Sequence, residues 1–181
     1  MLFRLLSAGT PGWGGQSPIY GAGRPGARLK VKGRWSTLKT MNEQKRNVRV
    51  RLTTVNDGRK SVVRADGEAY LRGGHTYIRY AEPSPELSGV TTTVKLGVDG
   101  IAVLRHGAVR AEQRFVVGKP AVGYYETGQG TFRLETLTER MDVRFEGGVG
   151  TASWSYRLTV GGAEAGHFQL NLDVREAESS I

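Results

Sequence analysis

The sequence predicts an all-β protein in which an antiparallel meander closes into a barrel of about 8–10 strands. Three observations support this fold class: apolar and polar residues alternate from Asn47 onward, glycine-containing turns recur between the alternating segments, and no segment long enough for a helix has helical spacing. Parallel strands need crossover helices, so antiparallel pairing is favoured. Closure of the sheet into a barrel removes the exposed edges that an open sheet of this many strands would have. A sandwich of two sheets is the alternative fold.

The first predicted strand follows Asn47, where three apolar residues alternate with three polar ones: Val48, Val50 and Leu52 with Arg49, Arg51 and Thr53. Asn56–Gly58 then supplies an Asp-Gly step, which tight hairpins prefer because their central residues need positive φ. Pro83–Pro85 opens the longest loop of this part of the chain. Further strands are predicted at 59–71, 76–82, 90–96, 101–105, 109–117, 121–127, 130–139, 141–146, 151–160 and 166–176.

Residues 1–40 differ in composition from the rest of the chain. They hold seven of the 26 Lys and Arg and none of the 17 Asp and Glu, so the remainder is nearly neutral. Frequent Gly and Pro interrupt any periodicity, which indicates a disordered basic extension. Gly21–Gly26 matches G-x-G-x-x-G, but no strand precedes it and Pro25 stands where the dinucleotide fold packs a helix, so we expect no cofactor.

Two interpretations of this extension compete: a basic arm that contacts phosphate backbones, and an upstream segment added by choosing too early a start codon. Met41 favours the second, because the composition changes there to M-N-E-Q-K-R-N followed by clean alternation. We therefore expect translation to start at Met41 and a barrel domain over residues 41–181. The intact mass of the native protein tests this expectation.

The composition also limits the chemistry that the protein can perform and indicates its cellular compartment. The 181 residues contain no cysteine, which excludes disulfides, thiol nucleophiles and thiolate metal sites. Neither a membrane-length apolar run nor a secretory signal is apparent, so we expect a cytoplasmic protein without a membrane partner. The three histidines show no ligand spacing and no catalytic motif is present, so we expect neither a metal site nor an enzyme.

One set of residues resembles a known family. The set is centred on Arg105, Gly107, Val109, Gln113, Arg114, Phe115, Val116 and Gly118, with Thr93, Lys95, Val103 and Leu104 before it and Tyr124, Tyr125, Gly130, Thr136, Tyr156 and Asn171 after it. Over about residues 47–176 the chain is similar to the YwiB-like family of small bacterial proteins, a domain of unknown function. The resemblance implies a calycin-like barrel, related in architecture to lipocalins. It implies no biochemical activity, because fold alone does not define function.

A barrel of this size can enclose one small ligand, and inward residues alternate with outward ones along each strand. In the segment 109–117, Gln113 is in phase with the apolar residues Val109, Ala111, Phe115 and Val117, so it is expected to point inward. We expect solvent to reach the charged residues of the opposite phase, because unpaired charges are rarely buried. These residues are Arg110, Glu112 and Arg114.

Other candidate lining residues have two open interpretations each. Arg105 is in phase with Ile101 and Val103, so it either pairs with an anionic ligand inside or anchors the adjacent turn at the rim. Thr91, Thr93 and Lys95 share one face of their strand, which is either lining or outer surface. Four tyrosines either point inward as amphipathic groups that could contact a ligand or pack as ordinary strand residues: Tyr80, Tyr124, Tyr125 and Tyr156.

We therefore expect a non-enzymatic barrel that binds a small amphipathic or anionic molecule in its interior. The alternative is a filled barrel that acts as a protein- or nucleic-acid-interaction module with a basic N-terminal arm. Nucleic acid is not the expected partner, because the body is nearly neutral and no strand pair interleaves aromatic and basic residues. The size of the internal cavity distinguishes a ligand site from a core packed with Phe115, Leu134 and Trp154. The oligomeric state is left open.

Overall fold

The computed structural model describes residues 45–177, and the extension predicted over residues 1–40 lies outside them. Ten strands and one short 3-10 helix, η1, follow one another along the described part of the chain. The strands are β1 (Arg46–Asn56), β2 (Arg59–Arg72), β3 (His75–Ala81), β4 (Thr91–Gly97), β5 (Gly100–His106), β6 (Arg110–Phe115), β7 (Pro120–Thr127), β8 (Gly130–Glu146), β9 (Val149–Val160) and β10 (Ala163–Glu176); η1 (Pro85–Leu87) lies between β3 and β4.

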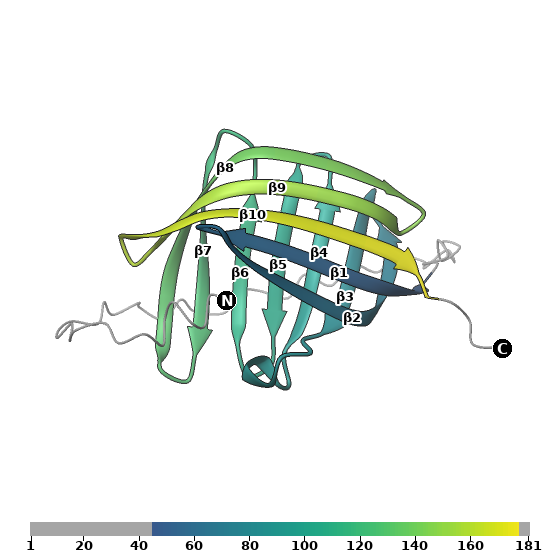
Figure 1. Ribbon diagram of the computed structural model, residues 1–181, viewed down its shortest axis with the longest axis horizontal. Helices are drawn as coiled ribbons and strands as arrows, with labels where there is room; N and C mark the ends of the chain where they lie inside the picture. Colours follow the sequence, from purple (N-terminus) through teal and green to yellow (C-terminus); the bar gives the residue numbers. More distant parts are fainter. Residues whose placement is uncertain (1–44, 178–181) are drawn as a thin grey trace, which may run out of the picture. The chain divides into compact units, whose positions relative to one another are not determined.

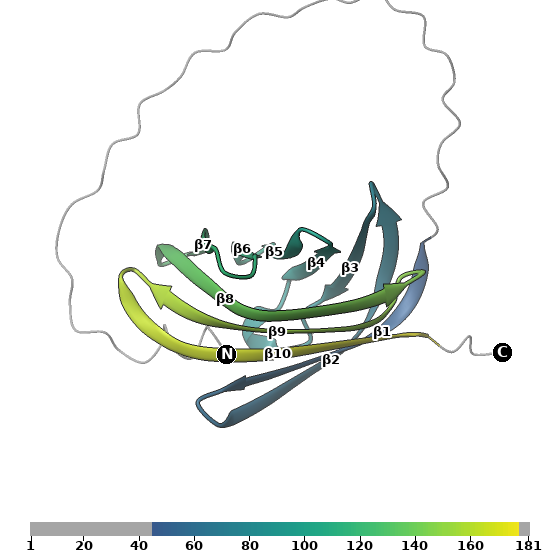
Figure 2. The ribbon, with the colours of Figure 1, turned by 90° about the horizontal axis from the view of Figure 1, so that it is seen from above.

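Every strand pairs antiparallel with its neighbours in sequence, and β1 closes the sheet by pairing with β10. The predicted closed antiparallel barrel is therefore confirmed, and the sandwich is excluded because no strand of the ten has a free edge along its whole length. In Figure 1 the long strands β8, β9 and β10 cross β3–β7 at a steep angle. Figure 2 shows that β8, β9 and β10 bend along their length, as strands that wrap a barrel must.

The strand boundaries follow the predicted ones closely, with one correction. Residues 130–139 and 141–146 were expected as separate strands, but they form the single strand β8. The register against β9 shifts between Thr138 and Arg140, which leaves Glu139 as the extra residue of a β-bulge. Because a bulge adds one residue, it reverses the alternation of inward and outward side chains, and this reversal looks like a strand break in the sequence.

The core fills the barrel from the inner faces of its strands. An aromatic cluster lies at its centre: Phe115 contacts Tyr156 and Trp154 with ring centroids 4.7 and 5.7 Å apart, and Tyr156 stacks on Phe168 at 5.3 Å. Aromatic pairs at these separations stabilise beyond their buried area alone. Leu134 is also almost completely buried. This part of the interior is packed rather than hollow.

Close backbone approach explains one glycine of the wall. Gly123 on β7 faces the end of the short ladder between β6 and β7. A Cβ at this position would lie 2.0 Å from the carbonyl oxygen of Glu112, closer than any side chain allows. Glycine therefore lets β6 and β7 meet where a larger residue would separate them.

The bulge residue Glu139 forms an exposed ion-pair cluster on the outer face. Its Oε1 accepts from Arg157 Nε at 2.9 Å, and its Oε2 lies 3.1 Å from His167 Nε2. The hydrogen bond from His167, together with Arg157, holds the pKa of Glu139 below its ordinary value of 4.5. Because the folded-state pKa is lowered, this stabilisation is complete above about pH 4.5 and is lost as the pH falls through the lowered pKa.

Replacing His167 with alanine should raise the pKa of Glu139 toward 4.5, because the largest cause of the lowering is removed. A ¹³C NMR titration of the Glu139 carboxyl in both proteins measures the shift. Gln169→Ala, on the same outer face of β10, is the matched control and should leave the pKa unchanged. An identical titration curve in the His167 variant would contradict the assigned hydrogen bond.

Candidate functional site

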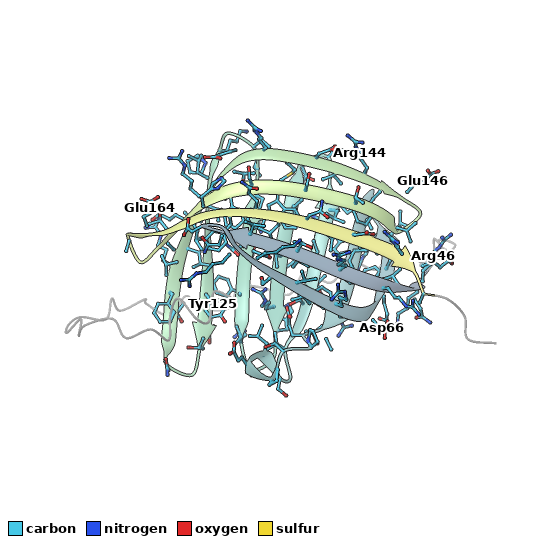
Figure 3. All side chains as sticks on the ribbon, in the orientation of Figure 1. Arg46, Asp66, Tyr125, Arg144, Glu146 and Glu164 are labelled. Atoms are coloured by element: carbon cyan, nitrogen blue, oxygen red, sulfur yellow. The ribbon has the colours of Figure 1, made fainter. Side chains whose placement is uncertain are left out.

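Seven polar side chains from the consecutive strands β3 to β7 and from β9 lie on the inner side of the barrel wall, and we call them the interior polar cluster. The cluster consists of Tyr80 on β3, Glu82 just after β3, Thr92 on β4, Arg105 on β5, Gln113 on β6, Tyr125 on β7 and Tyr156 on β9 (Tyr125 is labelled in Figure 3). Strand register aligns five neighbouring strands of the wall, β3 to β7, because Thr92 lies opposite both Tyr80 and Arg105, and Ala111 lies opposite both Arg105 and Tyr125. The cluster therefore lies near the β3–β4 loop and the β5–β6 turn.

An ion pair between Glu82 and Arg105 is the charged centre of the cluster. Glu82 Oε1 accepts from Thr92 Oγ1 at 2.5 Å and lies 3.5 Å from Arg105 Nε. The side chain of Glu82 is 3% exposed, whereas that of Arg105 is 21% exposed. The backbone N–H of Glu82 donates to the carbonyl of Val90 at 2.9 Å, which fixes the carboxylate at the start of the loop. Arg105 thus extends from a buried carboxylate toward solvent.

Three groups in the cluster have hydrogen-bonding capacity to spare. Within residues 45–177, the Nη groups of Arg105 have no hydrogen-bond or ion-pair partner, since only its Nε contacts Glu82. The Nε2 of Gln113 is buried without a partner in the same part of the chain. The buried hydroxyl of Tyr80 makes no hydrogen bond of normal geometry there, although Thr92 lies near enough to act on its pKa. Folded proteins rarely leave such groups unpaired. All three can donate, so the cluster is suited to an acceptor such as a carboxylate or another anionic group.

Burial keeps the tyrosine hydroxyls of the cluster protonated. The pKa of Tyr80 is raised by burial and by the nearby carboxylate of Glu82, against a smaller lowering by Arg105 and Thr92. Burial likewise raises the pKa of Tyr156 and of Tyr125, while Arg105 acts to lower both. All three phenols are therefore neutral hydrogen-bond donors, and the charge of Arg105 acts on the pKa of each.

The structure brings together five of the predicted lining residues and separates four. Placed inside the barrel are Tyr80, Arg105, Gln113, Tyr125 and Tyr156. The lining role predicted for the second group is wrong, because these side chains point outward: Thr91, Thr93, Lys95 and Tyr124. On β4 the inward phase is instead that of Thr92, Val94 and Leu96, each no more than 2% exposed.

Sequence reasoning missed Glu82 and Thr92. A signal existed for Glu82, because it is in phase with Ile78 and Tyr80 on β3, both of which are buried. Glu82 is the last residue before the loop that Pro83 opens, and it was not among the candidate lining residues. A signal existed for Thr92 as well, because it is in phase with the apolar residues Val90, Val94 and Leu96, all of which are buried.

Residues 45–177 hold no group of three or more His, Asp or Glu side chains arranged to bind a metal ion. No helix among them has the length and apolar character needed to span a bilayer. The interior polar cluster is therefore the candidate functional site of residues 45–177.

Comparison with known proteins identifies relatives of the same architecture. Residues 47–172 match the family model described as domain of unknown function (DUF1934). The uncharacterized beta-barrel protein YwiB of Bacillus subtilis (strain 168) is 32% identical over 107 residues, which cover 58% of this chain and 75% of YwiB. The crystal structure of ywiB protein from Bacillus subtilis superimposes with a TM-score of 0.56 at 24% identity, covering 75% of this chain and 94% of that chain. This structural likeness shows a shared barrel fold.

Proposed function

The chain belongs to the DUF1934 family of YwiB-like β-barrel proteins, and we propose that it is a non-enzymatic binding protein whose interior polar cluster holds a small anionic or amphipathic molecule. The observation behind this proposal is the pair of unpaired buried donors, Tyr80 OH and Gln113 Nε2, beside the free Nη groups of Arg105. An unpaired buried polar group costs about 1–3 kcal/mol, which a ligand acceptor would recover.

The chemistry of the cluster favours a ligand with one acidic group. A guanidinium binds carboxylate or phosphate through two parallel hydrogen bonds, and Arg105 has its Nη edge available for this geometry. Glu82 balances the charge of Arg105 from the opposite, buried side. The ligand must be small, because Phe115 and its aromatic neighbours fill the barrel beyond the cluster.

A filled barrel acting as a protein-interaction module is the second candidate, favoured by this aromatic packing. Ordered waters would then satisfy Tyr80 OH and Gln113 Nε2, as buried waters do in many proteins. In either case we propose a cytoplasmic protein without a membrane partner. The calycin relationship of the barrel stays a prediction.

Titration of the full chain with octanoate, a small amphipathic carboxylate, tests the proposal. The ¹⁵N NMR signal of Arg105 Nε should shift in a saturable manner, and native mass spectrometry should detect any molecule that co-purifies. Tyr80→Phe and Gln113→Leu should weaken binding about tenfold each, because each removes one donor to a charged group. Tyr124→Phe removes a hydroxyl on the outer face of β7 and is the matched control.

Absence of a co-purified molecule together with no shift of the Arg105 signal would contradict ligand binding. In that case, the stability of the Tyr80→Phe variant tests the second candidate, the filled barrel. If only water contacts this hydroxyl, the variant should unfold at about the same denaturant concentration as the wild type.

A further inference from the structure

The outer face of β10, β1 and β2 carries a groove that the interior site does not use. Its volume is about 390 Å³, within the range of roughly 300–1,000 Å³ typical of small-molecule sites. In Figure 1 β1 runs between β10 and β2, so three adjacent strands form the floor. Four arginines and two aspartates line it, and we call it the arginine groove: Arg49, Arg51, Arg64, Arg175, Asp66 and Asp173 (Asp66 is labelled in Figure 3).

Strand register places like charges directly opposite each other in the arginine groove. Arg51 on β1 faces Arg64 on β2, and Arg49 on β1 faces Arg175 on β10. Directly opposite residues have Cβ atoms only about 4.5–5.5 Å apart, and like charges in this arrangement destabilise a sheet. Arg49 also lies opposite Asp66 on β2, and Arg175 is paired with Asp173, so the pair that is unfavourable for the fold unless an anion lies beside it is Arg51 and Arg64.

The aspartates do not neutralise the central pair. Asp173 is bound by Arg175 through two hydrogen bonds, from Nε to Oδ1 at 3.1 Å and from Nη2 to Oδ2 at 2.9 Å. Arg51 lies opposite Asp173 in the register, yet neither Arg51 nor Arg64 has a hydrogen-bond or ion-pair partner within residues 45–177. Both side chains are exposed. The groove thus presents two free guanidinium groups side by side.

We infer that the arginine groove binds the phosphate or diphosphate group of a small molecule, held between Arg51 and Arg64. Two adjacent guanidinium forks match a group that carries two negative charges and several acceptor oxygens. Four arginines against two aspartates leave an excess of two positive charges, which a dianion balances. The groove lies outside the barrel, so this inference is independent of the interior ligand.

Titration of the full chain with inorganic pyrophosphate, followed by calorimetry and by thermal unfolding, tests the inference. Pyrophosphate should bind saturably and raise the melting temperature of the wild type. The double variant Arg51→Gln, Arg64→Gln should bind at least about tenfold more weakly, because two charged donors are lost. Without ligand, the same variant should melt at a higher temperature than the wild type, since the repulsive pair is gone.

The matched control is the double variant Arg133→Gln, Arg144→Gln. It removes the same charge from exposed arginines that are each paired with an acid: Arg133 with Glu135 at 3.2 Å and Arg144 with Asp142 at 2.9 Å. Pyrophosphate affinity should be retained in the control. Equal weakening in both variants, or no saturable binding by the wild type, would overturn the inference. Tighter binding of oligo-uridylate than of pyrophosphate through Arg51 and Arg64 would also overturn it, because the surface would then be a nucleic-acid interface.

Discussion

Replacing Arg105 with methionine is expected to lower the free energy of unfolding by about 3 kcal/mol at neutral pH, because it leaves a charged group buried without its counter-ion. The Glu82 side chain is 3% exposed, and after the substitution Thr92 is its remaining side-chain partner among the described residues. Methionine retains most of the apolar stem of arginine, so the loss of packing is small. Arg105 is partly exposed, and its Nε lies 3.5 Å from Glu82 Oε1. We therefore expect a loss of stability at the lower end of the range seen when a buried ion pair is broken.

Urea denaturation of the double variant Glu82→Gln, Arg105→Met separates charge from packing. Removal of both charges should restore most of the lost stability, because replacing a buried ion pair with neutral groups is often nearly neutral. A coupling energy of about 1–3 kcal/mol between the two substitutions is expected for groups in direct contact. If the double variant is no more stable than Arg105→Met alone, the ion pair is not what holds Glu82 in the barrel.

Replacing Phe115 with alanine should lower the free energy of unfolding by about 3–5 kcal/mol, the usual range for an aromatic residue lost from a packed core. Phe115 is 1% exposed and contacts the rings of Tyr156 and Trp154 at 4.7 and 5.7 Å. Its removal leaves a cavity that the rigid strands around it cannot close completely. Guanidinium or urea denaturation with two-state analysis measures the change.

Val117→Ala is the control for this substitution, because Val117 lies just beyond β6 and is 50% exposed. It should change the stability by less than about 0.5 kcal/mol. A loss below about 1 kcal/mol for Phe115→Ala would show that this part of the interior is loosely filled, as a ligand cavity would be. The substitution therefore also measures how much of the barrel is core and how much is open to a ligand.

The architecture could be predicted because the patterns that specify it are local. Alternation in residues 48–52 and the Asp-Gly step at Asp57–Gly58 lie within one hairpin of the chain, and the structure has β1, a turn and β2 there. Gln113 is buried in phase with Val109, Ala111 and Phe115, as predicted, whereas Val117, assigned to the same phase, is half exposed because it lies beyond the end of β6. Glu139 is the exception, since a bulge inserts one residue and only the partner strand β9 shows that β8 continues through it.

The candidate site was predicted less completely, because a strand pattern separates two faces without always saying which one is buried. On β4, Thr91, Thr93 and Lys95 were open to either interpretation, although the apolar phase of Val90, Val94 and Leu96 includes Thr92. Thr92 lies inside, opposite Tyr80 and Arg105. Glu82 acquires its role from Arg105, 23 residues later in the chain. Such contacts depend on the register between strands, which short-range periodicity does not contain.

The sequence by itself determined an antiparallel barrel, its turns and the inward phase of its clearest strands, because backbone alternation and turn chemistry act over a few neighbouring residues. Only the tertiary structure decided that Glu82 pairs with Arg105 inside the wall and that Arg49 on β1 faces Arg175 on β10 outside it. The physical reason is that these residue pairs form only when strands distant in sequence lie side by side in the sheet, about 4.8 Å apart and in one particular register.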